Sequence, residues 1–556
     1  MRRLNFRKRP AVRAVFQHYN YVGLVGAVVG FCISFLPSLL PRPWLFQGIV
    51  TGCSALIGYG VGTVSSLVIR WLIEWEPPKR VKHGAWRLLA VLDPVAALIY
   101  LYLSTGWQNE VRALIGEQPQ SERYIFRILF AALVTGGLLL AVARLVHFGA
   151  RKLIDLIDKL LPRKVSIIAG VGITVYICIT LLNGVFFASF VRFANRTYSN
   201  QNNGTPAAAA QPSQPERSGS LNSLVSWESL GYQGRGFVGR GPTVEQIEKF
   251  NNKAAKQPIR VYAGLHSAPT IRERAELAVK ELERTKAFDR SVLVIANATG
   301  TGWLEPQAVD SLEYMHSGDT AIASIQYSYL PSWLSFLVDK QNAKTAGQEL
   351  FDAVYGKWAT LPEGQRPKLI TYGLSLGSYG GQAAFSGAND LKYAVDGALF
   401  VGTPSDTELW NTITKNRDPH STQIEPVYRS GESVRFESNG KHLDATRSQW
   451  DGPRALYLQH ASDPVVWFDF DLLLNEPDWL QEPPGRDVSP SMQWYPFITF
   501  TQVALDQFLG NTTKPGYGHI YGNQMVAAWA AVTRPLSWTN DDSRRLQSVI
   551  DTYSQE

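Results

Sequence analysis

The chain of 556 residues is poor in cysteine and in charge. It contains 3 cysteines, and 18% of its residues are charged, against the ~25% usual in soluble domains. Cys32, Cys53 and Cys178 all lie in apolar runs near the N-terminus, so the sequence beyond them offers neither a disulfide nor a thiol nucleophile. The length predicts three or four structural units of about 150 residues, and the low charge points to a membrane protein.

Motifs for metals and nucleotides are also missing. The chain has no H-E-x-x-H, and its 9 histidines are scattered without paired ligand spacing, which argues against a metal site. The glycines of Asn297–Trp303 are not followed by G-K-[ST], and those of Arg235–Gly241 precede the first expected strand instead of joining a strand to a helix. We therefore expect no metal, no bound nucleotide and no cofactor.

The net charge of +7 conceals two halves of opposite sign. Residues 1–200 hold 23 Lys and Arg against 8 Asp and Glu, so the remainder holds 54−23=31 against 47−8=39. This acidic remainder would repel a phosphate backbone, and it shows no basic stripe with interleaved aromatic residues. We do not expect nucleic-acid binding.

Apolar runs near 20 residues, the length that crosses a hydrocarbon core of ~30 Å, dominate the first part of the chain. They are Tyr21–Leu40, Leu45–Val68, Trp86–Ser104, Tyr124–Val146 and Val165–Phe190. They predict an α-helical transmembrane domain of five spans over residues 1–194. Residues 195–242, rich in Asn, Gly, Ala, Pro and Ser, predict a flexible linker followed by a packed Gly-rich loop.

Lys and Arg are distributed unevenly over the loops between these runs. The N-terminus and the second and fourth loops carry 17 of them, against three in the first and third loops. The positive-inside rule places the basic loops in the cytoplasm. With five spans, a multi-pass protein of the cell membrane would then have a cytoplasmic N-terminus and an extracytoplasmic C-terminal domain.

Residues 243–556 alternate short apolar strand patterns with amphipathic helix patterns, the latter clearest at Ile271–Thr285 and Lys344–Thr360. The expected strands are Ile259–Gly264, Ser291–Ala296, Thr320–Gln326, Lys368–Tyr372, Gly397–Val401 and Ala455–Gln459. Such alternation predicts an α/β domain with a mainly parallel sheet flanked by helices. Insertions near 327–338, 407–452 and 466–510 should not complete sheet units.

Gly373-Leu-Ser-Leu-Gly377 follows the strand Lys368–Tyr372 and precedes a small-residue helix pattern. The combination of strand, G-x-S-x-G and helix predicts a nucleophile elbow, in which a sharp turn holds the serine exposed. Ser375 is the expected nucleophile, against the alternative of a structural Gly-rich turn.

The acid and the base of such a site must follow the serine in the chain, in that order. Asp463, at the end of the last expected strand, is the leading acid, and Asp406, Asp469 and Asp471 are its rivals. His519, in Gly516-Tyr-Gly-His-Ile-Tyr-Gly522 just before the expected helix Gln524–Val532, is the leading base. It would take the proton from Ser375 while Asp463 fixes its tautomer and orientation.

An acyl-transfer site also needs donors aimed at the developing oxyanion. The N–H of Leu376, next to the nucleophile, should supply one, and the loop of Gly300 and Thr301 should supply the other. The sequence leaves open which N–H in that loop faces the oxyanion. Residues expected to line the pocket are Trp303, His316, Tyr329 and Trp333.

The insertions are rich in tryptophan, with Trp333, Trp410, Trp450, Trp467, Trp479 and Trp494. Aromatic caps near a bilayer suit an acyl chain or another amphiphile, whereas large insertions also need aromatic cores of their own. Membrane attachment favours a lipidic ester substrate.

The chain resembles a bacterial family of membrane-anchored α/β-hydrolase-like proteins, with a multi-span N-terminal domain and an exported catalytic domain. The resemblance rests on Leu40–Trp44, Gly234–Val238, Thr299–Trp303, Gln326–Trp333 and Gly373–Gly377. It implies an α/β-hydrolase fold with Ser375 as nucleophile, and makes an ester of the bacterial envelope a plausible substrate. The favoured hypothesis is a serine esterase or lipase; the alternatives are an acyltransferase using the same triad and a non-catalytic envelope binding protein.

Overall fold

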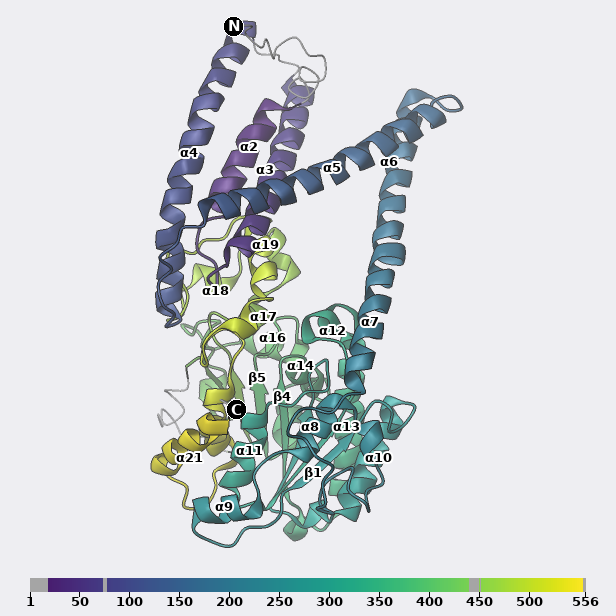
Figure 1. Ribbon diagram of the computed structural model, residues 1–556, viewed down its shortest axis with the longest axis vertical. Helices are drawn as coiled ribbons and strands as arrows, with labels where there is room; N and C mark the ends of the chain where they lie inside the picture. Colours follow the sequence, from purple (N-terminus) through teal and green to yellow (C-terminus); the bar gives the residue numbers. More distant parts are fainter. Residues whose placement is uncertain (1–18, 74–77, 440–449, 451, 554–556) are drawn as a thin grey trace. The chain divides into compact units, whose positions relative to one another are not determined.

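The computed structural model describes residues 19–73, 78–439, 450 and 452–553 (Figure 1). The N-terminal basic residues and part of the 407–452 insertion lie outside the described residues. The chain divides into two compact units. We call Met1–Phe187 with Phe470–Leu509 the helical unit, and Ala188–Asp469 with Gly510–Glu556 the sheet unit.

Long apolar helices make up most of the helical unit. They are α2 (Tyr21–Ile33), α3 (Trp44–Ile73), α4 (Lys79–Leu114), α5 (Ile125–Ile157) and α6 (Arg163–Thr180), which is followed by a π-helical segment Leu181–Phe187. The next helix, α7 (Ala188–Asn202), belongs to the sheet unit. Among the described residues, 4 helices are long and apolar enough to cross a membrane, starting at Trp44, His83, Ile125 and Arg163. The prediction of five long spans is therefore wrong at its first member. The run Tyr21–Leu40 forms a helix of only 13 residues, about 20 Å long, because Ser34–Pro43 leaves the helix around three prolines.

The central helix α3 packs against α2 and α5 through glycines. A Cβ added to Gly58 would lie 2.0 Å from the Gly26 carbonyl oxygen of α2, and one on Gly30 would lie 2.2 Å from the Ser54 oxygen. On another side of α3, a Cβ on Gly48 would lie 2.4 Å from the Ala131 Cβ of α5. Small residues at such spacing let apolar helices approach to backbone contact.

The helices alternate in direction, so the unit has two distinct ends. At one end the Tyr21 and Trp86 rings lie 5.7 Å apart, and Arg144 stacks over Tyr19. At the other end the Arg42 N–H donates to Gln108 Oε1 at 2.7 Å, and Phe35, Leu101 and Ile128 form an apolar cluster. Residues 34–43 and the end of α4 therefore share one end of the unit.

The helical unit also contains a segment from the C-terminal half of the chain. Residues 470–509, which include α18 (Asp478–Gln481) and α19 (Ile498–Asp506), belong to it. Helix α19 packs on α3, Asp506 pairs with Arg42, and the Ser489 hydroxyl bonds Glu110. The insertion near 466–510 is thus a piece of the catalytic half that folds with the N-terminal helices.

The sheet unit is built on a seven-stranded sheet whose described strands are all parallel, in the order β1-β3-β2-β4-β5-β7-β6. The strands are β1 (Ile259–Ala263), β2 (Val292–Asn297), β3 (Thr320–Ile325), β4 (Lys368–Leu374), β5 (Gly397–Val401), β6 (Val434–Glu437) and β7 (Arg454–Leu458). The six predicted strands are present. The seventh, β6, lies inside the 407–452 insertion, where we expected no strand, because its four residues are too short to show alternation and it pairs only at the sheet edge.

Helices cover both faces of this sheet. They are α9 (Val244–Asn251), α10 (Ile271–Arg284), α11 (Pro306–Met315), α12 (Ser332–Val338), α13 (Lys340–Ala359), α14 (Leu376–Gln382), α15 (Ala388–Ala394), α16 (Glu408–Lys415), α17 (Pro464–Trp467), α20 (Met525–Thr533) and α21 (Asn540–Tyr553). Val294 and Tyr372 pack with Trp529 of α20 and the buried face of α11 in one large core. Helix α13 contacts both α10 and α14.

The segment 195–242 is ordered and is part of the sheet unit. Residues Trp227–Leu230 form a 3-10 turn and Gly231–Gly239 form α8, where the sequence predicts a loop. Glycine is tolerated because the helix lies against Tyr262, whose ring would be 2.6 Å from a Cβ on Gly234. The local glycine penalty is thus offset by tertiary packing.

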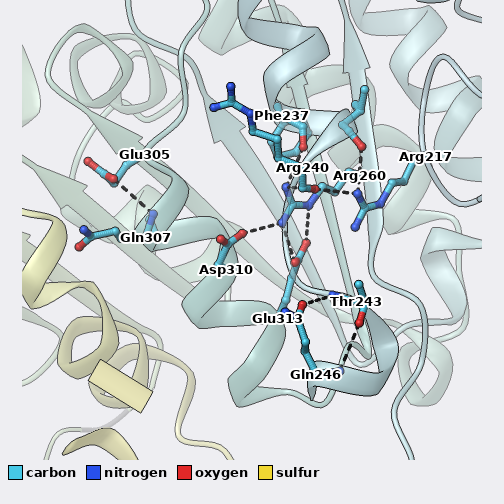
Figure 2. A network of polar contacts seen from close by, with 12 residues as sticks. Arg217, Phe237, Arg240, Thr243, Gln246, Arg260, Glu305, Gln307, Asp310 and Glu313 are labelled. Atoms are coloured by element: carbon cyan, nitrogen blue, oxygen red, sulfur yellow. Dashed lines mark hydrogen bonds and ion pairs between the residues drawn. The ribbon is translucent and has the colours of Figure 1, made fainter. Parts of the chain in front are cut away.

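Buried charges fasten this segment to the sheet (Figure 2). Arg260 of β1 donates to both Glu313 oxygens and to Asp310 at 2.7 Å, and to the Phe237 carbonyl at the end of α8, also at 2.7 Å. Arg217 donates to the Arg240 carbonyl at 2.7 Å. The two guanidinium groups thereby satisfy carbonyls that the end of α8 leaves open.

Candidate active site

Ser375 occupies a strained turn between β4 and α14. Its backbone has φ 57° and ψ −124°, a conformation that costs a non-glycine residue about 1–3 kcal/mol. Its N–H donates to the Val401 carbonyl of β5 at 2.8 Å, and its carbonyl accepts the N–H of Tyr379 at 3.0 Å. The turn is thus held from both sides.

The two glycines of the motif are required by close contacts. A Cβ on Gly373 would lie 2.3 Å from the Gly377 oxygen, and one on Gly377 would lie 2.1 Å from the Asn297 oxygen at the end of β2. A side chain at Gly373 would clash within the elbow, and one at Gly377 would force the elbow away from the end of β2. This is the physical reason for G-x-S-x-G at this turn.

Asp463 and His519 are in direct contact. The imidazole Nδ1 lies 2.7 Å from Asp463 Oδ2, and both side chains are buried. Asp463 Oδ1 accepts the Val465 N–H at 2.8 Å, and Oδ2 accepts the Tyr521 hydroxyl at 2.7 Å. With its carboxylate oxygens occupied in this way, Asp463 orients the ring with Nδ1–H donating to it. The other ring nitrogen, Nε2, is buried and has no hydrogen-bond partner among the described residues.

Ser375 and His519 meet at the carboxyl end of β5. Val401 accepts the Ser375 N–H, and a Cβ on the next residue, Gly402, would lie 2.7 Å from His519 Cε1. Asp463 follows β7, the neighbour of β5 in the sheet. The three residues therefore come from the ends of adjacent strands and one loop, although within the described residues no hydrogen bond joins Ser375 to His519.

Residues that the sequence analysis did not assign to the site support this arrangement. The Tyr521 hydroxyl bridges Asp463 and the N–H of His460 at 2.7 and 3.0 Å. The His460 ring stacks on Tyr521 with centroids 4.0 Å apart, and its Nδ1 lies 2.8 Å from the Gly518 carbonyl. The loops that carry the acid and the base are thus tied together. Tyr521 stands two residues after His519, and this short spacing is the only local sequence feature that points to its role beside the base.

The loop after β2 lies beside the elbow. The amides of Ala298, Gly300, Thr301 and Leu376 carry no hydrogen bond within the part of the chain that the structure describes. Ala298 directly follows Asn297, whose oxygen faces Gly377, whereas a Cβ on Gly300 would lie 2.6 Å from Ser335 of α12. Ala298, which the sequence analysis did not single out, is therefore the residue of this loop nearest the elbow.

The residues expected to line a pocket do not gather in one place. Trp303 borders a cavity of about 640 Å³, together with Phe237, Glu305, Gln307 and Asp310, and several of these are seen in Figure 2. Tyr329 packs near Leu330 and Leu334, and Trp333 lies in α12, with its side chain outside what is described. Burial raises the pKa of Glu305 to about 7. The residues that border this cavity do not include Ser375, Asp463 or His519.

His316, which was expected to line the pocket, lies at the opposite edge of the sheet from Ser375 and does not border the cavity at Trp303. It follows α11 and precedes β3, and its Nε2 contacts Thr533 Oγ1 at 3.0 Å. Burial, with a smaller contribution from Lys368 at the start of β4, lowers its pKa to about 4. Ser375 follows the far end of the same strand β4.

Comparison with known proteins identifies the family of the chain. Residues 259–546 match the model of an alpha/beta-hydrolase family, and residues 35–242 match the model of that family's N-terminus. The chain belongs to this alpha/beta-hydrolase family. No curated protein and no solved structure matches the hydrolase.

The two regions that match family models begin and end at different kinds of structural element. The catalytic match begins at β1 and ends within α21, whereas the N-terminal match runs from the loop after α2 through α8. The N-terminal region of the hydrolase therefore includes α8, which Arg260 fastens to the sheet. The apolar runs predicted a membrane-embedded N-terminal region, which the four long apolar helices support. The α/β-hydrolase fold that the resemblance implied is confirmed by the parallel sheet and the family match.

Proposed function

We propose that the protein is a membrane-anchored serine hydrolase that cleaves an ester through Ser375, His519 and Asp463. The observation that carries the proposal is the pair of His519 and Asp463 at 2.7 Å, beside a serine held at positive φ. The Nε2 atom of His519 is buried and has no hydrogen-bond partner in the described part of the chain. An imidazole fixed through Nδ1 presents Nε2 as a proton acceptor. The strained elbow presents a hydroxyl to the same strand end.

The reaction follows from these positions. Ser375 Oγ attacks the ester carbonyl as His519 Nε2 takes its proton, and Asp463 stabilises the imidazolium that forms. The oxyanion is stabilised by the N–H of Leu376 and a second N–H from Ala298, Gly300 or Thr301. His519 then protonates the leaving alcohol, and a water molecule, deprotonated by His519, hydrolyses the acyl-enzyme.

The substrate we propose is an amphiphilic or lipidic ester of the cell envelope, on the extracytoplasmic side of the cell membrane. The basic second and fourth loops lie at the end of the helical unit marked by Tyr21, Trp86 and Arg144. Residues 34–43 and the end of α4 lie at the other end, and there they bind residues 489 and 506 of the catalytic half. The positive-inside rule assigns the basic end to the cytoplasm.

The test is covalent labelling of the purified full-length protein with a fluorophosphonate probe, followed by hydrolysis of p-nitrophenyl esters of graded chain length. Ser375→Ala should abolish labelling, and His519→Ala should lower kcat by about 10⁴-fold or more. The exposed His266 provides a matched control, and His266→Ala should leave both readouts unchanged.

Folded wild-type protein that is not labelled in lipid would refute catalysis and favour a non-catalytic binding role. Product formation that requires an added alcohol, with little hydrolysis, would identify an acyltransferase instead, since both reactions share the acyl-enzyme.

A further inference from the structure

We propose that Gln382 is a positioning residue for Ser375 and His519, because its buried amide holds the helix that begins after the nucleophile against the turn on which the base rests. The inference deepens the proposed function and rests on it. Gln382 is the last residue of α14, seven residues after the serine. All the contacts that carry the inference lie within the sheet unit.

The side-chain amide of Gln382 is enclosed and hydrogen bonded through both of its polar atoms. The residue is 1% exposed. Its Nε2 donates to Ser378 Oγ at 3.0 Å and to Thr403 Oγ1 at 3.3 Å, and its Oε1 accepts the Tyr457 hydroxyl at 2.8 Å. Ser378 and Thr403 also bond each other at 2.7 Å. One buried amide therefore joins α14 to the segment after β5 and to β7.

Packing against the neighbouring helix does little to fix the position of α14 along its own axis. Three of its seven residues are glycines, and a Cβ on Gly347 of α13 would lie 2.0 Å from the Gly380 carbonyl oxygen. The two helices therefore meet through their backbones, without large side chains that interlock at this contact. Because a hydrogen bond has a preferred length and direction, the Gln382 amide sets the position that this packing leaves open.

The segment that Gln382 holds is the one against which the base packs. Val401, at the end of β5, accepts the N–H of the nucleophile at 2.8 Å. Gly402 follows with φ 53°, and a Cβ there would lie 2.7 Å from His519 Cε1. Thr403 comes next and carries the hydroxyl that Gln382 binds. Three consecutive residues thus contact the nucleophile, the base and the amide in turn.

Loss of the amide would free this turn to shift relative to α14. The nucleophile stands directly before α14 and the base packs on the turn, so such a shift changes the distance from Ser375 Oγ to His519 Nε2. A change of about 1 Å in the placement of a catalytic group can lower a rate about 100-fold. The carboxylate of Asp463 has partners of its own in Val465 and Tyr521, so the ionisation of the base should not change.

Gln348 of α13 provides a matched control. It has the same side chain, and its amide donates at 2.9 Å to the carbonyl of Ala383, the residue directly after Gln382. Gln348 is exposed, and its bond reaches α14 alone. Gln348→Met should therefore loosen the same end of α14 without releasing the turn at Thr403.

The experiment uses the full-length protein in lipid nanodiscs, as wild type, Gln382→Met, Thr403→Val, the double variant, Thr403→Ser and Gln348→Met. Titration with a fluorophosphonate gives the fraction of reactive sites, and the labelling rate and kcat are expressed per reactive site. Gln382→Met keeps the length of the side chain without its hydrogen bonds. It should lower the labelling rate and kcat about 10- to 100-fold, with KM and the pH midpoint of kcat/KM nearly unchanged.

The Thr403 variants test whether the amide acts through the turn. Thr403→Val keeps the shape of the side chain but removes the hydroxyl, so it should also lower kcat. The double variant should lose little more than the larger single loss, because both changes break one network. Thr403→Ser keeps the hydroxyl and should retain most of the wild-type rate.

Hydrogen exchange on the same samples reports the coupling without relying on catalysis. Gln382→Met should speed exchange in peptides covering 376–383 and 400–406, while β2 keeps its protection. Gln348→Met should leave both kcat and the exchange of 400–406 at wild-type values.

A wild-type kcat per reactive site in Gln382→Met, with only the reactive fraction reduced, would overturn the proposal, as would equal losses of kcat in Gln382→Met and Gln348→Met. If Gln382→Met does not fold, Thr403→Val and Tyr457→Phe, which breaks the bond to Gln382 Oε1, supply the same comparison. The proposed function fails separately: unlabelled wild type would refute catalysis, whereas labelled wild type with an unchanged rate in Gln382→Met would refute only the positioning role.

Discussion

The contacts that stabilise the helical unit internally differ in kind from those that stabilise the sheet unit internally. In the helical unit large apolar side chains face outward, with Phe126 87% and Leu133 74% exposed, and the helices touch through glycines. In the sheet unit the large side chains are inside, with Val294 and Trp529 each 1% exposed. Lipid is as apolar as leucine, so burying leucine between membrane helices gains little, whereas close backbone packing does. In water the same burial is the main source of stability.

The largest effect is expected from filling the glycine contact between α2 and α3. Gly58→Leu places a side chain where a Cβ alone would lie 2.0 Å from the Gly26 oxygen, so α2 must leave α3, at a cost above about 3 kcal/mol. In Gly60→Leu the added Cβ meets nothing within 4 Å, and that variant should behave as wild type. Thermal unfolding and size-exclusion profiles in detergent would measure the difference. Equal profiles for the two variants would contradict glycine packing as the basis of this unit.

Truncation of a large side chain should matter only in the sheet unit. Trp529→Ala removes a ring that packs on Tyr372 with centroids 5.5 Å apart and whose Nε1 donates to the Ala308 carbonyl. We expect a loss of about 3–5 kcal/mol in unfolding free energy. Leu133→Ala, on the exposed face of α5, should change it by no more than about 0.5 kcal/mol. Denaturant titration followed by circular dichroism would test both, and a larger loss in Leu133→Ala would reverse the comparison.

A smaller effect concerns the pH dependence of the sheet unit. Burial lowers the pKa of His316 to about 4, below the ~6.5 of an unfolded chain. The unfolded state therefore binds more protons between these values, and stability should fall as pH drops from about 6.5 to 4. His316→Gln should remove about 1–3 kcal/mol of that loss. Unfolding midpoints at pH 4.5 and 7.5 would show it, with the exposed His266→Gln as the control.

Glu305 should show the opposite trend and the smallest effect. Burial raises its pKa to about 7, above the ~4.3 of an unfolded chain, so the folded state holds the proton longer. Stability should then decrease as pH rises from about 4.3 to 7. Glu305→Gln keeps an acceptor for the Gln307 N–H and should stabilise the protein at pH 8 by about 1–2 kcal/mol, with no gain at pH 4. A gain of equal size at both pH values would argue against a titrating Glu305. Exposed Glu363→Gln is the control.

Some features of the fold could be read from local patterns. The six expected strands and the helices α10 and α13 were predictable because a buried strand and an amphipathic helix each impose a period on neighbouring residues. Strand β6 was not predictable from the sequence, because four residues at the sheet edge are too few to show a period. Helix α8 was not predictable either, because its glycines disfavour a helix locally. Only its contact with Tyr262 allows these glycines to be helical.

The residues of the candidate site also fall into those that could be predicted from local sequence and those that could not. Ser375 could be placed because its motif and the preceding strand are contiguous, and Asp463 and His519 because the order of the chain restricts them. Tyr521, His460 and Gly402 could not be placed, because their roles come from hydrogen bonds, stacking and close packing between loops far apart in the sequence. His316 was expected in the pocket, and the direction of α11 carries it to the other edge of the sheet.

The sequence alone determined that an apolar helical region precedes an α/β domain, and that a serine stands at a strand-to-helix turn. These properties depend on composition and on residues within one turn or one strand of each other. Tertiary structure alone decided that residues 470–509 fold with the N-terminal helices and that Arg42 meets Asp506. Such pairings depend on which surfaces exclude solvent together, and residues separated by more than four hundred positions carry no local pattern that encodes it.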